Sequence, residues 1–206
     1  IISPTTEKLI AEFSRKYGNV THVQMDAISY HGMLEANKST FGVRALPTYN
    51  FDKADVIVSF GADFLGNWGS SDYATDYANG RNPKNKKMSK HYQIESTLTL
   101  TGSNADERIP IKPSEQAPLL SNLYNELKGE SSNNKHIMKI AASLKSAQSS
   151  IVVCNSNDKD VQLLVNSINN QLGNYGNTID MSTPSYLRKG NDEDVAALVS
   201  DMKDGK

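Results

Sequence analysis

The residues whose types suit chemistry fall in three polar loops, at 26–32, 61–70 and 96–104. Each loop follows a segment that resembles a strand. In open parallel sheets, ligands bind beyond the carboxyl ends of the strands. The sequence therefore predicts that a ligand site, where one exists, is built from these loops.

The first loop places His31 directly after Tyr30, with Asp26 close by in the sequence. Histidine titrates near neutral pH and can serve as a general acid or base. No nucleophile motif accompanies it, so a loop histidine held by its neighbours is the alternative interpretation. Tyr30 and His31 are the catalytic candidates that the sequence offers. No histidines or carboxylates have the spacing of metal ligands, so no metal site is predicted.

The second loop opens on Gly61, where the absence of a Cβ lets the backbone approach a ligand closely. The pattern is neither a dinucleotide-binding glycine motif nor a Walker loop, and a structural turn is the alternative. For the single tryptophan, Trp68, the sequence leaves three alternatives open: it covers a ligand, it fills an interface, or it packs against its own loop. The cofactor-binding candidates are Gly61, Asp63, Asn67, Trp68, Glu95 and Ser96.

Strands and helices alternate along the chain. Residues 55–60 are short, continuous and β-branched, as in a strand buried on both faces. Further strands are predicted at 20–25, 91–95, 150–154 and near 178–179. Alternation of this kind predicts an α/β fold, with a mostly parallel sheet flanked by helices.

A polar stretch at 130–134 is the predicted boundary between two α/β segments, 1–129 and 135–206. The chain begins as if leaving a strand and ends on a helix with nothing after it. We therefore expect a piece of a longer protein, with the second segment truncated at its C-terminus.

Composition narrows the possible partners. The formal net charge of −1 leaves no basic surplus for nucleic acid. One cysteine, Cys154, cannot hold an iron–sulfur cluster, and its apolar neighbours predict a buried side chain. No apolar stretch is long enough to span a bilayer, so no direct membrane span is expected.

Three motifs, in order, resemble those of the molybdopterin oxidoreductase family. Residues 54–63 (ADVIVSFGAD) are similar to its strand and following loop, 105–113 (ADERIPIKP) to a downstream segment, and 171–178 (QLGNYGNT) to a turn. Stretches at 3–6, 26–30, 61–68 and 101–106 resemble more closely the large iron–sulfur subunit of bacterial alternative complex III, a quinol:electron acceptor oxidoreductase.

That resemblance implies a Rossmann-like fragment of a molybdopterin oxidoreductase-type subunit. Its expected partners are the other subunits of a membrane-bound respiratory complex, on the periplasmic side of the bacterial inner membrane. It further implies a domain without cofactor that serves structure and assembly, with the iron–sulfur clusters in a missing part of the parent chain. An active molybdopterin-dependent domain holding molybdopterin guanine dinucleotide is one alternative, and a guanine-nucleotide-type binding module is the second.

Departures from the family pattern favour the interpretation that the domain holds no cofactor. Tyr30 stands where catalytic relatives place a metal-ligating cysteine or selenocysteine before a His-Gly, and a neutral phenol is a poor soft ligand. Ser29 keeps the question open, because some relatives use serine. Glu95 and Gln116 stand in segments where relatives have a nucleotide-receiving Asp-Pro-Arg and a guanine-reading carboxylate.

Overall fold

A four-stranded sheet with strand order β4-β3-β2-β5 forms the centre of the protein. The computed structural model describes residues 2–85 and 87–205. The strands are β2 (Val56–Phe60), β3 (Lys90–Glu95), β4 (Glu107–Pro110) and β5 (Ser150–Cys154). Every neighbouring pair is parallel, which confirms the predicted α/β class with a parallel sheet.

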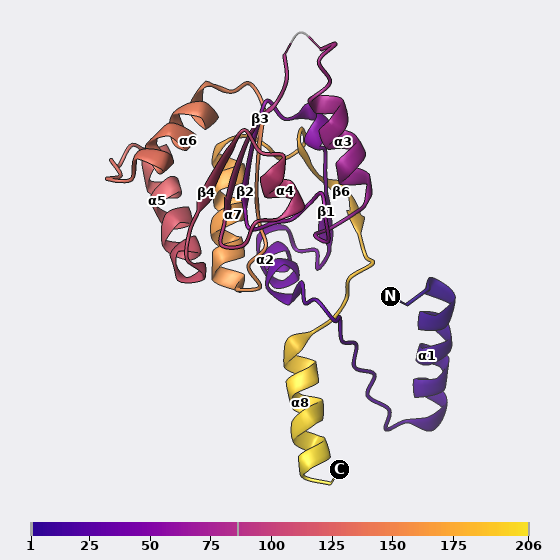
Figure 1. Ribbon diagram of the computed structural model, residues 1–206. Helices are drawn as coiled ribbons and strands as arrows, with labels where there is room; N and C mark the ends of the chain where they lie inside the picture. Colours follow the sequence, from indigo (N-terminus) through magenta and orange to yellow (C-terminus); the bar gives the residue numbers. More distant parts are fainter. Residues whose placement is uncertain (1, 86, 206) are drawn as a thin grey trace.

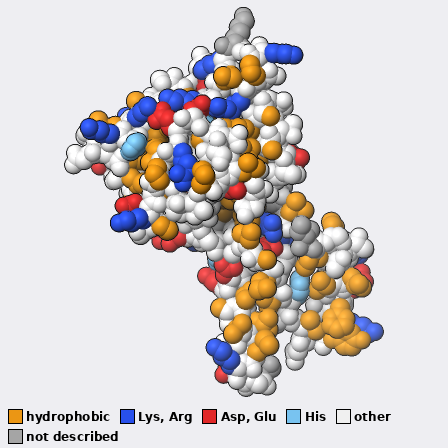
Figure 2. Space-filling view, viewed as in Figure 1, with side chains coloured by type: hydrophobic (Ala, Val, Ile, Leu, Met, Phe, Trp, Pro, Cys, Tyr) orange, Lys and Arg blue, Asp and Glu red, His pale blue; other side chains and the backbone are white. Residues whose placement is uncertain are grey.

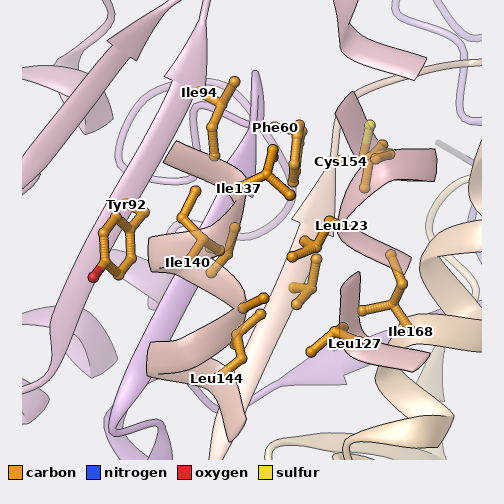
Figure 3. Packing of buried hydrophobic residues seen from close by; sticks show 14 of the residues in the cluster. Phe60, Tyr92, Ile94, Leu123, Leu127, Ile137, Ile140, Leu144, Cys154 and Ile168 are labelled. Carbon is orange, nitrogen blue, oxygen red and sulfur yellow. The ribbon is translucent and has the colours of Figure 1, made fainter. Parts of the chain in front are cut away.

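Helices cover both faces of this sheet (Figure 1). One face carries α5 (Gln116–Lys128), α6 (Lys135–Ser146) and α7 (Lys159–Gln171). Residues Val56, Val58 and Phe60 of β2 belong to the apolar cluster in that layer. Phe60 packs there with Leu123 and Ile140 (Figure 3). Successive strand side chains point to opposite faces, so both faces of a central strand must be apolar. Cys154 is fully buried in the same cluster, as predicted.

The opposite face carries α2 (His31–Phe41), α3 (Asp72–Gly80) and a two-stranded antiparallel ribbon. The ribbon pairs β1 (Leu46–Tyr49) with β6 (Ile179–Ser185). A second core, rich in aromatic side chains, lies there. Phe51 and Phe64 stack within it at 4.3 Å between ring centroids.

Short elements connect the rest: η1 (Phe51–Lys53), α4 (Leu100–Ser103) and η2 (Pro113–Glu115). The strand predicted at 20–25 does not form. A strand needs a partner for its backbone groups, and among the described residues none pairs with this stretch. The segments 1–129 and 135–206 contribute β2 and β5 to one sheet, and their division into two domains stays a prediction.

Two helices stand apart from this body, α1 (Pro4–Tyr17) and α8 (Asp192–Lys203) (Figure 1). Ser3 and Asn191 cap their first turns through side-chain oxygens. Neither helix has a buried residue, and hydrophobic side chains lie open on both (Figure 2). Within the described residues, no helix combines the length and apolar character that crossing a membrane requires.

Candidate ligand-binding cleft

A cleft opens at the carboxyl edge of the sheet, where the chain leaves β2 and β5. From β2 the chain moves on to β3 and β4 on one side, while β5 adds on the other side. Such a reversal of strand order is where open α/β sheets bind ligands. Two hollows of about 240 and 230 Å³ meet there, and both are lined by Gly61 and Asn155.

Gly61 and Asn155 hold the two strand ends close together. Gly61 has φ +69°, and a Cβ added to it would lie 2.6 Å from Asn155 Oδ1. The amide of Gln116 bridges the same place, donating to the Phe60 carbonyl and to Asn155 Oδ1, each at 2.9 Å. The floor of the cleft is therefore fixed by a glycine that no other residue replaces without displacing Asn155.

The first hollow is polar on one side and aromatic on the other. Ser29, Asp63 and Asn67 line it together with Tyr30 and Trp68. Asp63 Oδ1 accepts the Thr101 backbone N–H at 3.0 Å and its hydroxyl at 2.6 Å. The carboxylate is thereby held at the wall, and the loop after β2 is fastened to α4.

The second hollow lies over the end of β3, where Glu95 and Ser96 line it. Glu95 is 3% exposed. Its carboxylate accepts Arg108 Nε at 2.6 Å and the Thr99 hydroxyl at 2.7 Å. Burial raises the pKa of this carboxyl, but the hydrogen bonds from Thr99 and Arg108 outweigh it and leave the pKa below its ordinary value. With these partners in place, the carboxylate is anionic and already occupied.

A buried polar chain runs along β3 to this carboxylate. Gln93 Nε2 donates to Glu95 Oε2 at 3.1 Å, so Gln93 Oε1 accepts from His91 Nε2 at 3.3 Å. His91 Nδ1 lies 3.1 Å from the Tyr77 hydroxyl oxygen, and that hydroxyl donates to the Asn104 carbonyl at 2.9 Å. His91 and Gln93 are fully buried. The Gln93 amide donates to Glu95, and this bond helps to orient the carboxylate at the cleft.

His91 makes stability depend on pH. Burial lowers its pKa to about 4, although the Gln93 hydrogen bond opposes this, so the folded protein holds the ring neutral. The unfolded chain takes up a proton below about pH 6.5. The stabilisation is therefore complete above pH 6.5 and is lost progressively as the pH falls towards 4. We expect about 2 kcal/mol less stability at pH 5 than at pH 7.5 from this residue.

Urea unfolding at both pH values measures the effect in the wild type and in His91→Gln. The variant should show a shallower pH dependence of stability, because it lacks the imidazole. The remaining titratable groups contribute equally to both proteins. An unchanged pH dependence in His91→Gln would show that the ring is not the responsible group.

The catalytic candidates Tyr30 and His31 lie close together but do not form a relay. Ser29 Oγ donates directly to the Asp192 carboxylate at 2.8 Å, while His31 Nδ1 accepts the Asp192 backbone N–H at 3.3 Å. The imidazole therefore does not stand between hydroxyl and carboxylate, as a general base would. The Tyr30 hydroxyl accepts from Gly69 N at 2.9 Å, so Tyr30 serves as a wall of the first hollow.

The cleft does not provide the positive charge that a phosphate requires. Among the described residues, neither lysine nor arginine lines either hollow. Three helix N-termini nearby already bond a side-chain oxygen: Asn157 accepts from α2, Thr99 from α4 and Asp158 from α7. A capped terminus has few free N–H groups left for an anion. In residues 2–85 and 87–205, no three His, Cys, Asp or Glu side chains gather as metal ligands would.

The structure brings all six predicted cofactor-binding candidates to the edge of one cleft. Gly61, Asp63, Asn67 and Trp68 line the first hollow, and Glu95 and Ser96 line the second. The sequence reasoning missed Asn155 and Ser156, and it named Gln116 only as a departure from the family pattern. The signal for Asn155 was present, because it directly follows the apolar run of β5 and so also lies at a carboxyl strand end.

The fold and the cleft define the protein as an α/β protein of Rossmann-like architecture with a polar cleft at the strand ends. No protein-family model matches the chain, and no curated protein matches its sequence. A solved structure with a similar fold is the formyltransferase/hydrolase complex (FhcABCD) from Methylorubrum extorquens, in complex with methylofuran. The TM-score is 0.51 at 16% identity, over 69% of this chain and 41% of that one.

The predicted membership of the molybdopterin oxidoreductases, and of alternative complex III within them, is therefore wrong. The structural match is to a formyltransferase/hydrolase complex, and no family model supports the motifs. The function drawn from the resemblance, structure and assembly in a respiratory electron-transfer complex, is wrong with it, and neither alternative function is retained. The absence of a cofactor and the periplasmic location are untested and stay predictions.

The motifs misled because each serves the fold. Residues 54–63 are a buried parallel strand with a glycine turn, which many α/β proteins need at this place. Residues 171–178 end α7 on Gly173 at φ +68°, a common helix stop. Short segments shaped by such demands recur without common descent.

Proposed function

We propose that the protein binds a small, neutral, polyhydroxylated molecule in the cleft at the ends of β2, β3 and β5. The observation that carries the proposal is the lining of the two hollows, which combines amide, hydroxyl and carboxylate groups with no lysine or arginine among the described residues. Ligand hydroxyls both donate and accept hydrogen bonds. They therefore suit a wall where Asn155 and Gln116 offer amide groups and Asp63 offers acceptors.

Trp68 provides a direct readout, because it lines the first hollow and is the single tryptophan of the chain. Titration with D-ribose, xylitol and myo-inositol is expected to change its fluorescence saturably for at least one of the three, whereas GTP has no effect. Asn155→Ala should weaken that binding about fivefold, the value of one hydrogen bond. The matched control is Asn170→Ala, an exposed amide on α7 outside the cleft, which should bind like the wild type.

Two results count against the proposal. One is a GTP response at lower concentration than any polyol, which would mean that the cleft accepts phosphate. The other is a flat response to all three polyols.

Assembly with partner subunits is a second candidate function, which we infer from α1 and α8. Leu9, Phe13 and Tyr17 recur every fourth residue on α1 and are 64%, 53% and 60% exposed. Leu198 and Met202 form a similar row on α8, at 43% and 67%. Exposed rows of apolar side chains commonly mark surfaces that bind another protein, because covering them removes apolar area from water. The solved structure of similar fold also belongs to a multi-subunit complex.

Cross-linking in the native cell tests this idea by position. Lys8 and Lys16 of α1 and Lys203 of α8 should cross-link to another polypeptide more often than lysines of the α/β body. Cross-links from the body alone would exclude α1 and α8 as the docking surface.

A further inference from the structure

A third hollow lies beside the cleft and shares Tyr30 with it. Its volume is about 490 Å³, within the range of small-molecule pockets. Tyr30, Tyr49 and Tyr73 line it, and Asp72 and Asp76 of α3 stand along it. It differs from the cleft in chemistry, since no asparagine or glutamine is among its described lining residues.

The three tyrosines belong to one aromatic cluster. The rings of Tyr49 and Tyr73 meet edge to face at 5.9 Å between centroids, and Trp68 lies 5.4 Å from Tyr49. Each ring carries a negative face that attracts cations. The chain itself uses this attraction, because the guanidinium of Arg188 sits 5.3 Å from the centroid of the Tyr30 ring. A cation thus already rests on one wall of the pocket.

The carboxylates of α3 are crowded by like charge. Burial and the nearby Asp52 and Asp72 raise the pKa of Asp76, while Lys53 opposes them. Arg188 also lines the pocket, and its guanidinium lies 3.8 Å from the Asp26 carboxylate. The end of the pocket at Asp76 therefore carries negative charge that a bound cation would offset.

We propose that this pocket binds an organic cation, a guanidinium or ammonium group, which lies against the Tyr49 and Tyr73 rings and pairs with Asp76. The aromatic walls supply the apolar contact, and the carboxylates select for positive charge. The site adjoins the polyol cleft at Tyr30, but its proposed contacts are other residues, and it does not depend on the function proposed there.

Butylguanidinium and its uncharged isostere butylurea form the decisive pair of probes, compared by isothermal titration calorimetry. Butylguanidinium is expected to bind and butylurea to bind at least tenfold more weakly, because shape is equal and charge is not. Asp76→Asn should weaken butylguanidinium binding about tenfold, as expected for a charge-assisted hydrogen bond. Tyr73→Phe should keep the affinity, since the ring remains.

The source of the cation follows from a further comparison. A blocked Gly-Arg-Gly peptide that binds more tightly than butylguanidinium indicates a side chain of another protein, and weaker binding indicates a free small molecule. Both results support the cation site.

Thermal unfolding separates binding from folding. Asp76→Asn should be at least as stable as the wild type without ligand, because it removes a carboxylate that its neighbours repel. Glu130→Gln, a carboxylate in the loop after α5, is the control and should change neither binding nor stability. Equal affinity for butylurea and butylguanidinium, no binding of either, or full affinity in Asp76→Asn would overturn the proposal.

Discussion

Replacing Arg108 by leucine is expected to lower the free energy of unfolding by about 3 kcal/mol at neutral pH. Arg108 Nε lies 2.6 Å from Glu95 Oε1, and the Glu95 side chain is only 2% exposed. Leucine fills much of the volume of the arginine stem but leaves the carboxylate without its counter-charge. Removing one partner of a buried pair costs more than the pair itself contributes. Thr99 and Gln93 still donate to Glu95, which keeps the loss at the lower end of such values.

A second substitution identifies the cause. Glu95→Gln in the Arg108→Leu background removes the uncompensated charge, so it should restore more than half of the lost stability. Urea unfolding of the two single variants and the double variant measures the coupling between the residues. If the double variant is as unstable as Arg108→Leu, lost packing of the arginine stem explains the effect instead.

The sequence predicted those strands whose β-branched composition matches their burial in the folded protein. β2 and β5 are apolar runs of β-branched residues, a pattern typical of strands buried on both faces. Strand β1 was not predicted, because it is only four residues long and includes Pro47. It pairs with β6, some 130 positions away in the sequence, and the register of the pairing shifts between Leu46 and Thr48. A pairing so distant in the chain leaves no local signal. The predicted strand at 20–25 failed for the converse reason: its composition favours a strand, but no strand among the described residues pairs with it.

The sequence predicted where the cleft lies, but it did not predict the buried hydrogen-bonded side chains beside it. The rule that ligands lie beyond carboxyl strand ends led to Gly61 and Glu95, and the structure places both there. The buried chain on β3 was not predictable, because alternating polar residues such as His91, Gln93 and Glu95 ordinarily indicate a strand with one face in water. Here Tyr77 of α3 covers that face, and the polar groups satisfy one another. Only the three-dimensional arrangement shows this.

Truncating Trp68 is expected to have the largest effect of any single change considered, a loss of about 3–5 kcal/mol in Trp68→Ala. The ring is 8% exposed and belongs to the second core, with Tyr73 at 6.1 Å between centroids. The sequence left open whether Trp68 covers a ligand, fills an interface or packs its loop. In the structure the ring belongs to the second core and also lines the first hollow. Its neighbour Phe64 is more deeply buried, at 2% exposure, and so the loop after β2 is anchored by two rings.

Unfolding of Trp68→Ala must be followed by circular dichroism, since the fluorophore is lost. Trp68→Phe is the matched variant and should lose about 1–2 kcal/mol, because a smaller ring retains most contacts with the tyrosines. The cavity left by alanine enlarges the first hollow and removes its aromatic wall. Polyol binding, followed by isothermal titration calorimetry because both variants lack the fluorophore, should therefore weaken in Trp68→Ala and persist in Trp68→Phe. A Trp68→Ala protein within 1 kcal/mol of the wild type would mean that the ring does not hold this core together. The loop after β2 would then owe its position to Phe64 and to hydrogen bonds such as those between Asp63 and Thr101.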